Sequence, residues 1–249
     1  MSSMRALICS FLGLCLLSIS PLANAQGTFQ NLGFESATIV PIPGDPYGRV
    51  QFAPAFPGWT GALGGIPQGG ALYNSVFLDS AAISILDQGW NSVSNNFPQT
   101  RGGLITGSFT PVLIAGLGDP MQQPADATLS QTALVPADAQ SLRFRAYLDF
   151  VGVSGSFTVR LGGQTLPVAP LLTTTKYTTY GADIHQWAGQ VAELAFTAVA
   201  QQPHLGDTYF YLDTIAFSNQ PIPEPSVFSL TILGTLLLGW QVLNRRRSP

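Results

Sequence analysis

Three segments of the chain alternate apolar and polar side chains with a period of two residues, as a strand with one buried face does. They are Ser141–Leu148, Ser156–Leu161 and Val191–Val199. A fourth segment, Thr208–Ser218, is rich in the aromatic and β-branched residues that favour strands. This periodicity predicts half-buried strands and excludes a helical reading of the same residues.

Further strands are expected at Ala71–Phe77, Ala82–Leu86, Leu104–Thr110 and Ala127–Leu134. The chain has 26 glycines and 19 prolines against 9% charged residues, a composition typical of strands joined by turns. Stretches rich in these breakers are expected to be surface loops, namely Pro41–Gly58, Gly64–Gly70, Asp87–Gly103 and Gly116–Pro124. We therefore predict an all-β fold, an antiparallel β-sandwich of about eight or nine strands, with a jelly roll preferred.

The first 25 residues have the three parts of a secretory signal peptide. Arg5 precedes an apolar core from Ala6 to Ile19, and small residues at Ala23 and Ala25 form a cleavage site before Gln26. The alternative is an uncleaved membrane anchor, for which the apolar run is short. Both cysteines lie in this segment, so the predicted exported domain has neither a thiol nor a disulfide.

The last residues carry a second targeting segment. Val227–Leu243 is apolar over 17 residues, and a helix of that length would cover about 25 Å, the lower limit for spanning hydrocarbon. Arginines at 245, 246 and 247 follow it and would remain on the cytoplasmic side. The alternative is a buried C-terminal helix of the globular domain. We expect a transmembrane helix at 227–243.

This tail resembles a known sorting signal. The tripeptide Pro223, Glu224, Pro225, then the apolar segment, then Arg245, Arg246, Arg247, is similar to the PEP-CTERM signal of Gram-negative bacteria. The resemblance covers about 27 residues and implies transient retention in the inner membrane, processing by an exosortase-type enzyme, and a destination at the cell surface or in a polysaccharide matrix. The expected organisation is 1–25 signal peptide, 26–220 β-sandwich and 221–249 sorting signal.

A second resemblance spans most of residues 26–220. Its landmarks are similar to the Asn-Gly-x-Phe-Glu, Pro-Gly-Trp, Ser-Gln-x and Leu-Asp-x-Ile patterns of galactose-binding-like jelly rolls. They are Asn31–Glu35, Pro57–Thr60, Ala127–Thr132 and Tyr211–Ile215, with Leu32 inserted before Gly33. Members of that group often hold a structural calcium ion, and by motif position its ligands would include Glu35 and Asp213. The alternative is that both are solvated residues at strand ends; no other cofactor is required.

Sugar binding normally uses an aromatic face rimmed by a few polar groups. Trp90 is the leading candidate, with Asn91 and Arg101 near it in sequence; Tyr47 and Trp187 rank below it, and Trp59 is expected in the core. Each of these aromatic residues has core packing as its alternative role. His185 and His204, with Asp183 and Asp207, form a transition-metal set that nothing in their spacing requires.

Arg5 and the three tail arginines account for four of the ten basic residues, and Glu224 for one of the 13 acidic residues. The remaining chain carries six basic and 12 acidic residues, which argues against nucleic acid as a partner. Signatures of nucleophilic, metal-dependent and phosphate-binding enzymes are missing from the sequence. We therefore expect a non-enzymatic surface or matrix protein that binds extracellular polysaccharide. The alternatives are a purely structural or adhesive protein and a hydrolase of envelope polysaccharide.

Overall fold

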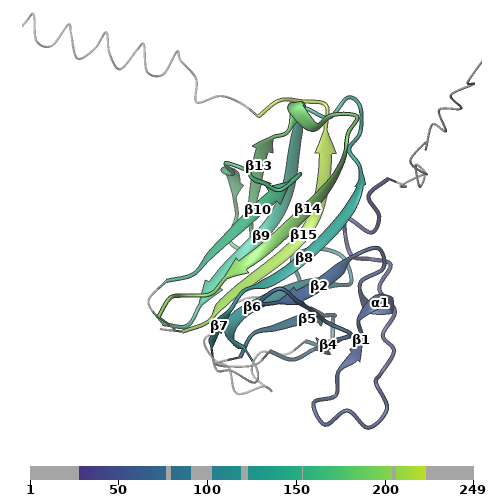
Figure 1. Ribbon diagram of the computed structural model, residues 1–249, viewed down its shortest axis with the longest axis vertical. Helices are drawn as coiled ribbons and strands as arrows, with labels where there is room; N and C mark the ends of the chain where they lie inside the picture. The colour runs from purple at the N-terminus through teal and green to yellow at the C-terminus, as the bar shows by residue number, and fades with distance from the viewer. Residues whose placement is uncertain are drawn as a thin grey trace, which may run out of the picture.

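The chain folds into two β-sheets packed face to face, as the computed structural model shows (Figure 1). The structure describes residues 28–76, 80–90, 103–118, 123–152, 154–203 and 206–222. Within these residues the predicted all-β sandwich is confirmed, and none of the helices there is long and apolar enough to cross a membrane. The signal peptide with Ala23, Ala25 and Gln26, the sorting motif, the 227–243 segment and the tail arginines lie outside them.

The larger sheet has nine strands in the spatial order β1-β4-β5-β6-β15-β9-β13-β12, with β7 paired to β6. All its pairs are antiparallel except β4 with β5. Its strands are β1 (Val50–Gln51), β4 (Gly70–Tyr73), β5 (Ala82–Leu86), β6 (Thr110–Gly118), β7 (Gln123–Ala125), β9 (Ser141–Phe150), β12 (Ala169–Thr173), β13 (Thr178–Asp183) and β15 (Thr208–Ser218).

The smaller sheet has six antiparallel strands in the order β11-β10-β14-β8-β2-β3. They are β2 (Thr60–Leu63), β3 (Ile66–Pro67), β8 (Ala127–Leu134), β10 (Ser156–Leu161), β11 (Gln164–Thr165) and β14 (Val191–Val199). From β6 onward the chain crosses repeatedly between the sheets, so β6-β15-β9-β13 in one sheet faces β8-β14-β10-β11 in the other. Such interleaving is the strand order of two Greek keys in a jelly roll.

Aromatic rings from both sheets meet in the core between them. Phe144 of β9 lies edge-on to Phe196 of β14, with ring centroids 5.1 Å apart. Phe157 of β10 stacks on Phe210 of β15 at 4.4 Å. Aromatic pairs of this kind add about 0.5–1.5 kcal/mol to the stability that area burial provides. The alternation expected from the sequence is confirmed in β9, β10 and β14, with Glu193 exposed between buried neighbours on β14.

The outer face of the nine-stranded sheet, the face turned away from the smaller sheet, is covered over much of its area. A second apolar cluster forms there, so β5 and the first half of β15 are buried on both faces. The cluster consists of Leu72, Val76, Ala82, Leu86, Ile105, Val112, Ile114, Tyr209 and Tyr211, with Trp90, Tyr147, Val151 and Tyr177 packed at its edge. The sequence predicted half-buried strands. The apolar cluster on the outer face explains why β5 and the first half of β15 instead have continuous apolar runs.

Four expectations about individual elements are wrong. The expected loop Gly64–Gly70 contains β3 and the first residue of β4. The expected loop Gly116–Pro124 contains the end of β6 and the first two residues of β7, which pair with each other. Leu104–Thr110 was expected to be a strand, but its residues from Leu104 to Phe109 form a loop, and the strand β6 begins at Thr110. The expected loop Pro41–Gly58 contains β1 and a four-residue helix, α1 (Phe52–Ala55). Phe52 and Ala55 of this helix are buried in the core. This tertiary packing stabilises a helical turn in a segment whose glycines and prolines predict a loop.

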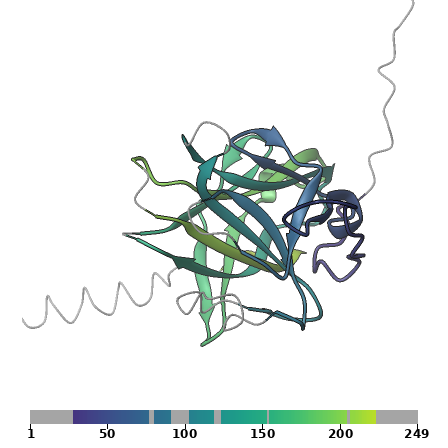
Figure 2. The ribbon, with the colours of Figure 1, turned by 90° about the horizontal axis from the view of Figure 1, so that it is seen from below.

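Both ends of the described chain are bound to the sandwich. Gln30 donates its backbone N–H to the Gln131 side chain of β8 at 2.6 Å, and the N-terminal segment lies to one side of the sandwich when it is seen from below (Figure 2). At the other end, Ser141 donates to the carbonyl of Gln220 at 2.6 Å and Arg143 to that of Pro221 at 3.4 Å. The chain therefore follows β9 of the larger sheet up to its last described residues.

Candidate functional site

Trp90, the leading glycan candidate, lies on a tight turn after β5. The Asp87 carboxylate organises this turn, because it accepts hydrogen bonds from Tyr73 Oη, from Asn74 Nδ2 at 2.6 Å and from the Gly89 N–H at 2.7 Å. Burial alone would raise the pKa of Asp87, but these hydrogen bonds outweigh it and hold the pKa below its ordinary value. These hydrogen bonds fix the conformation of the turn, and the turn thereby fixes the position of Trp90.

The Trp90 side chain is half-buried and packs at the edge of the outer-face cluster. A large aromatic ring in that position contributes packing energy to the fold. The position of Trp90 therefore agrees with core packing, the alternative role given for it in the sequence analysis. Asn91 and Arg101 lie outside the described residues, so the three-residue glycan site stays a prediction. Trp59 and Trp187 are buried, Trp59 with its indole N–H donated to the Asn31 carbonyl.

Glu35 and Asp213, the expected calcium ligands, hold one loop between β5 and β6. Asp213 Oδ2 accepts the backbone N–H of Thr106 at 2.8 Å and its hydroxyl at 2.7 Å. Glu35 accepts the N–H of Ser108, at 2.9 Å for Oε2. A Cβ on Gly107 would overlap the Glu35 carboxylate, so glycine permits this close approach. The structure brings both acids to the same short segment, Thr106 to Ser108.

Asp213 is 1% exposed, so it is not a solvated strand-end residue. Burial raises the pKa of its carboxyl, against hydrogen bonds from Thr106 and Thr214 that act to lower it. Thr214 has a φ of 47°, which is uncommon for a β-branched residue, and its N–H donates to Asp213 Oδ1. Strain at this bulge of β15 turns the Asp213 carboxylate toward the loop.

The residues present fit a calcium ion poorly. Calcium takes six to eight oxygen ligands, whereas Thr106, Ser108 and Thr214 present N–H donors to these two carboxylates. Nowhere in the described ranges do three or more His, Cys, Asp or Glu side chains gather as metal ligands would. Asp183 accepts from His185 at 2.8 Å in an exposed pair, and His204 is outside those ranges.

A projecting loop, residues 41–49, presents the most exposed aromatic ring of the described chain. We call it the finger; it extends past the end of β1 (Figure 1). Asp45, whose side chain is 4% exposed, accepts the N–H groups of Tyr47 and Arg49, each at 3.0 Å, and Arg49 Nε at 2.8 Å. These bonds from the Arg49 side chain and backbone lower the pKa of Asp45 to about 2.

Tyr47 stands at the tip of the finger with 63% of its surface exposed. The guanidinium carbon of Arg49 lies 5.7 Å from the centroid of its ring. The tip therefore combines an exposed aromatic ring with a positioned cationic donor, and sites that orient a ligand combine aromatic and polar groups in this way. The sequence ranked Tyr47 below Trp90. The missed signal was the pairing of Asp45 with Arg49 four residues on, among the rigid or turn-forming Pro43, Gly44, Pro46 and Gly48.

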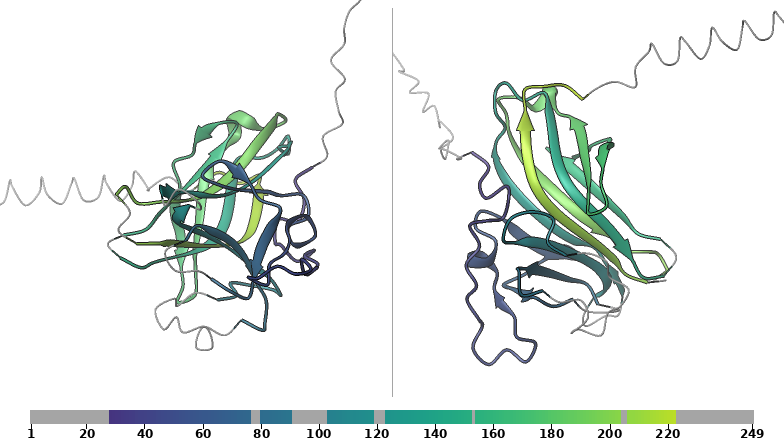
Figure 3. Two further views of the ribbon diagram at one scale, coloured as in Figure 1. Left: turned by 60° about the horizontal axis from the view of Figure 1, so that its bottom comes forward. Right: turned by 180° about the vertical axis from the view of Figure 1, so that it is seen from behind.

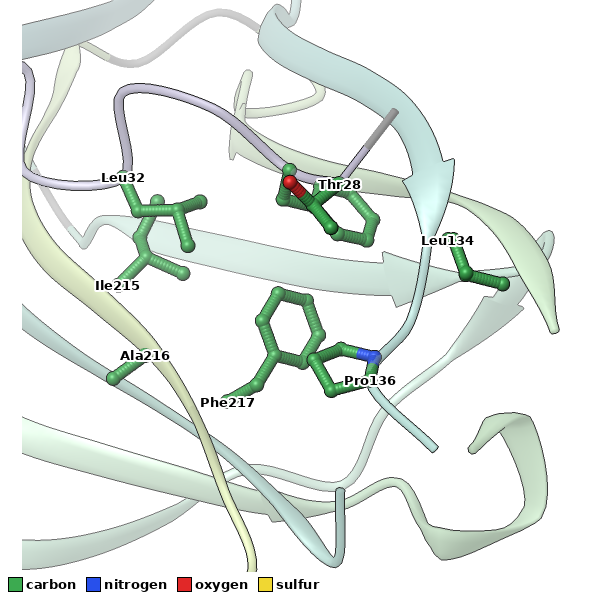
Figure 4. Close-up of a pocket in the computed structure, with 8 residues that line it drawn as sticks. Thr28, Leu32, Leu134, Pro136, Ile215, Ala216 and Phe217 are labelled. Carbon is green, nitrogen blue, oxygen red and sulfur yellow. The ribbon is translucent and has the colours of Figure 1, made fainter. Parts of the chain in front are cut away.

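A groove of about 360 Å³ lies between the N-terminal segment and the ends of β8 and β15 (Figure 4). Its walls are apolar, with Leu32, Ile215, Phe217 and Pro136 turned toward one another, and Thr28 is the one lining residue with a polar side chain. A sugar site needs several polar groups to fix the ligand, so this groove does not provide one.

The described chain is therefore a two-sheet β-sandwich that bears a rigid, aromatic-tipped finger at one end. No protein-family model matches the sequence, and no curated protein matches it. Among solved structures, TmCBM61 in complex with beta-1,4-galactotriose is similar, at 12% identity and a TM-score of 0.41 over 78% of this chain and 99% of that chain. A likeness of this degree carries no argument about the ligand, which we take from the residues of this chain.

Proposed function

We propose that this chain is an exported, non-enzymatic surface or matrix protein whose β-sandwich binds extracellular polysaccharide. The observation that carries the proposal is Tyr47, 63% exposed on a finger that Asp45 and Arg49 hold rigid. A pre-organised aromatic surface binds with little loss of conformational entropy, because its side chain and loop are already ordered. The apolar face of a pyranose would lie on the ring, with the Arg49 guanidinium beside it.

The non-enzymatic part of the proposal rests on what the described carboxylates do. Asp45, Asp87, Asp213 and Glu35 each accept backbone N–H groups that shape a loop. A glycosidase needs two placed carboxyl groups free to exchange protons with substrate and water. We assign these four to loop structure, and sugar release from exopolysaccharide by the purified chain would contradict that assignment.

Export and sorting follow from the two terminal segments. A signal peptide ending before Gln26 and a PEP-CTERM tail would carry the chain through the inner membrane to the surface, with an exosortase-type enzyme as the processing partner. The sandwich would then meet polysaccharide at its destination. Cell fractionation checks this: surface or matrix localisation is expected, and a cytoplasmic chain would overturn it.

Binding is tested with the full-length chain in mild detergent and the exopolysaccharide of its source organism. Tyr47→Ala should raise the Kd about tenfold, the cost of removing an aromatic anchor, while Tyr47→Phe should keep the affinity. Phe150→Ala is the matched control, since Phe150 is a 45% exposed aromatic of β9 outside the finger. Equal losses in the Tyr47→Ala and Phe150→Ala variants would remove the finger from the site.

A further inference from the structure

Basic side chains gather on and beside one part of the outer face of the nine-stranded sheet. Six basic residues lie between positions 26 and 220, against 12 acidic ones. Three of the six are Arg143 and Arg145 on β9 and Lys176 in the turn before β13. Figure 3 (right) shows β15, β9 and β13 side by side on this face. A positive patch on an otherwise acidic domain attracts anions.

Arg145 occupies the centre of this patch. In the strand register it lies between Thr179 of β13 and Asp213 of β15, all three on the same face. Facing side chains of neighbouring strands have Cβ atoms about 5 Å apart, so the Thr179 hydroxyl is within reach of a group bound by Arg145. The guanidinium carbon of Arg145 also lies 5.0 Å from the centroid of the Tyr177 ring. Stacking on a ring fixes the guanidinium plane and leaves its N–H edges open.

The acid opposite Arg145 does not neutralise it. Asp213 has turned its carboxylate to Thr106 and Thr214, and it forms no ion pair with Arg145. Across the described residues, no hydrogen bond or ion pair reaches the Arg145 guanidinium, although the residue is half-buried. Its five N–H donors have no acceptor among the described residues and remain available to an external one.

We propose that Arg145, with Thr179 beside it and Tyr177 beneath it, binds the carboxylate of an acidic sugar, a uronate unit of an extracellular polymer. The planar fork of arginine matches a carboxylate with two parallel hydrogen bonds, and Arg143 and Lys176 add charge to attract the polymer. The site lies on a different part of the sandwich from the finger. It goes beyond general polysaccharide binding because it selects charged polymers over neutral ones.

The test compares full-length chains for binding to polygalacturonate, alginate and hyaluronate, each paired with its carboxyl-reduced neutral counterpart. The parent chain should bind at least one carboxylated polymer about tenfold more tightly than its neutral counterpart, as expected for charge-assisted hydrogen bonds. Its binding to that polymer should be weaker at 200 mM than at 20 mM NaCl, because salt screens the charges. Arg145→Gln should abolish that preference. Arg145→Lys, which keeps the charge without the fork, should restore only part of it.

Arg160→Gln is the matched control, because Arg160 lies on β10 of the other sheet and, within the described ranges, bonds only the Gly163 carbonyl of its own hairpin. It changes the net charge by the same amount and should leave the preference intact. Equal losses in the Arg145→Gln and Arg160→Gln chains would overturn the proposal, as would equal binding of every acidic polymer and its neutral counterpart. Tyr47→Ala separates the two proposals: it should weaken neutral and acidic binding alike and leave their ratio unchanged.

Discussion

Glu35 and Asp213, from opposite ends of the described chain, hold the same loop: Asp213 accepts the N–H of Thr106, and Glu35 accepts that of Ser108. The loop enters β6, which pairs with β15 in the centre of the larger sheet. These two carboxylates therefore join the first and last parts of the described chain to the start of a central strand.

Calcium should leave the stability of the protein unchanged. The N–H donors of Thr106 and Ser108 already face the two carboxylates, where a calcium ion would need oxygen atoms. Thermal unfolding of the metal-free chain at increasing calcium, up to millimolar, measures this. A rise in melting temperature that Glu35→Gln abolishes would restore the calcium site expected from the sequence.

The stability of the protein relative to an Asp213→Asn variant should depend on pH. Burial raises the pKa of Asp213 above 3.8, so the folded state holds a proton more tightly than the unfolded state does. Its contribution is fully present below the unfolded pKa and is lost as pH rises through the folded pKa. The stability advantage of the parent chain over Asp213→Asn should thus be larger at pH 3.5 than at pH 7. Denaturant unfolding at both pH values measures it; equal differences would contradict the buried, protonatable carboxyl.

Gly61→Ala should destabilise the fold by about 1–3 kcal/mol, the cost of overpacking a core. A methyl group on Gly61 of β2 would overlap the ring of Phe52 and the Ile83 side chain. Gly69→Ala is the control, because no atom beyond its own chain neighbours lies within 4 Å of the position its methyl group would take. Urea unfolding of both variants should separate them, and similar midpoints would show that α1 does not pack on β2 as described.

Binding through the finger should be independent of pH between 7 and 4. Hydrogen bonds from Arg49 lower the pKa of Asp45 to about 2, below the value of 3.8 that the free side chain has. The bonds are therefore present above pH 3.8 and are lost only as pH falls toward 2. Affinity for a neutral polysaccharide, measured by calorimetry at pH 7, 5.5 and 4, should not change. A loss by pH 5 would indicate a different titrating group at the tip.

Protein isolated from the envelope of its source organism should begin at Gln26 and lack the 227–243 segment. Its intact mass, with N-terminal sequencing, measures both ends. Glu224→Ala should leave the apolar tail attached and keep the chain in the inner-membrane fraction. Arg160→Gln, outside the sorting motif, should be processed like the parent chain. Normal processing of the Glu224→Ala chain would contradict the recognition of the Pro223–Pro225 motif.

The sequence predicted strands best where a period-two alternation or a run of aromatic and β-branched residues marks them. Val191–Val199, Ser156–Leu161 and Ala127–Leu134 match β14, β10 and β8 at both ends. Ala82–Leu86 and Thr208–Ser218 also match β5 and β15 at both ends, although β5 and the first half of β15 are buried on both faces. The sequence missed the strand β6, whose residues from Pro111 to Gly118 are apolar on both faces and contain three breakers. The outer-face cluster that covers it draws residues from β4, β5 and β15 as well as from loops, and local periodicity holds no information about this cover.

In the candidate sites, too, the local sequence indicated single residues but not the distant residues that contact them. The pattern singled out Glu35, Asp213 and Trp90 as important, and the structure places each in a fixed local network. Asp213 and Glu35 bind the backbone of Thr106 and Ser108, and only folding brings these together. Trp90 follows a turn built on Asp87, whose partner Tyr73 comes from another strand. The alternation of Ser141–Leu148 places Arg145 on the polar face of a strand. Its position over the Tyr177 ring depends on the pairing of β9 with β13, which no sequence motif marks.

Ser141 and Arg143 donate hydrogen bonds to the carbonyls of Gln220 and Pro221, so the chain stays bound to the sandwich almost to Ile222, the last described residue. Four residues, Pro223 to Ser226, separate that point from the apolar tail, a span of at most about 14 Å. Before processing, this short connection would hold the domain close to the bilayer surface, with its Gln220 end facing the membrane. Cleavage would then release an already folded, compact ligand-binding head.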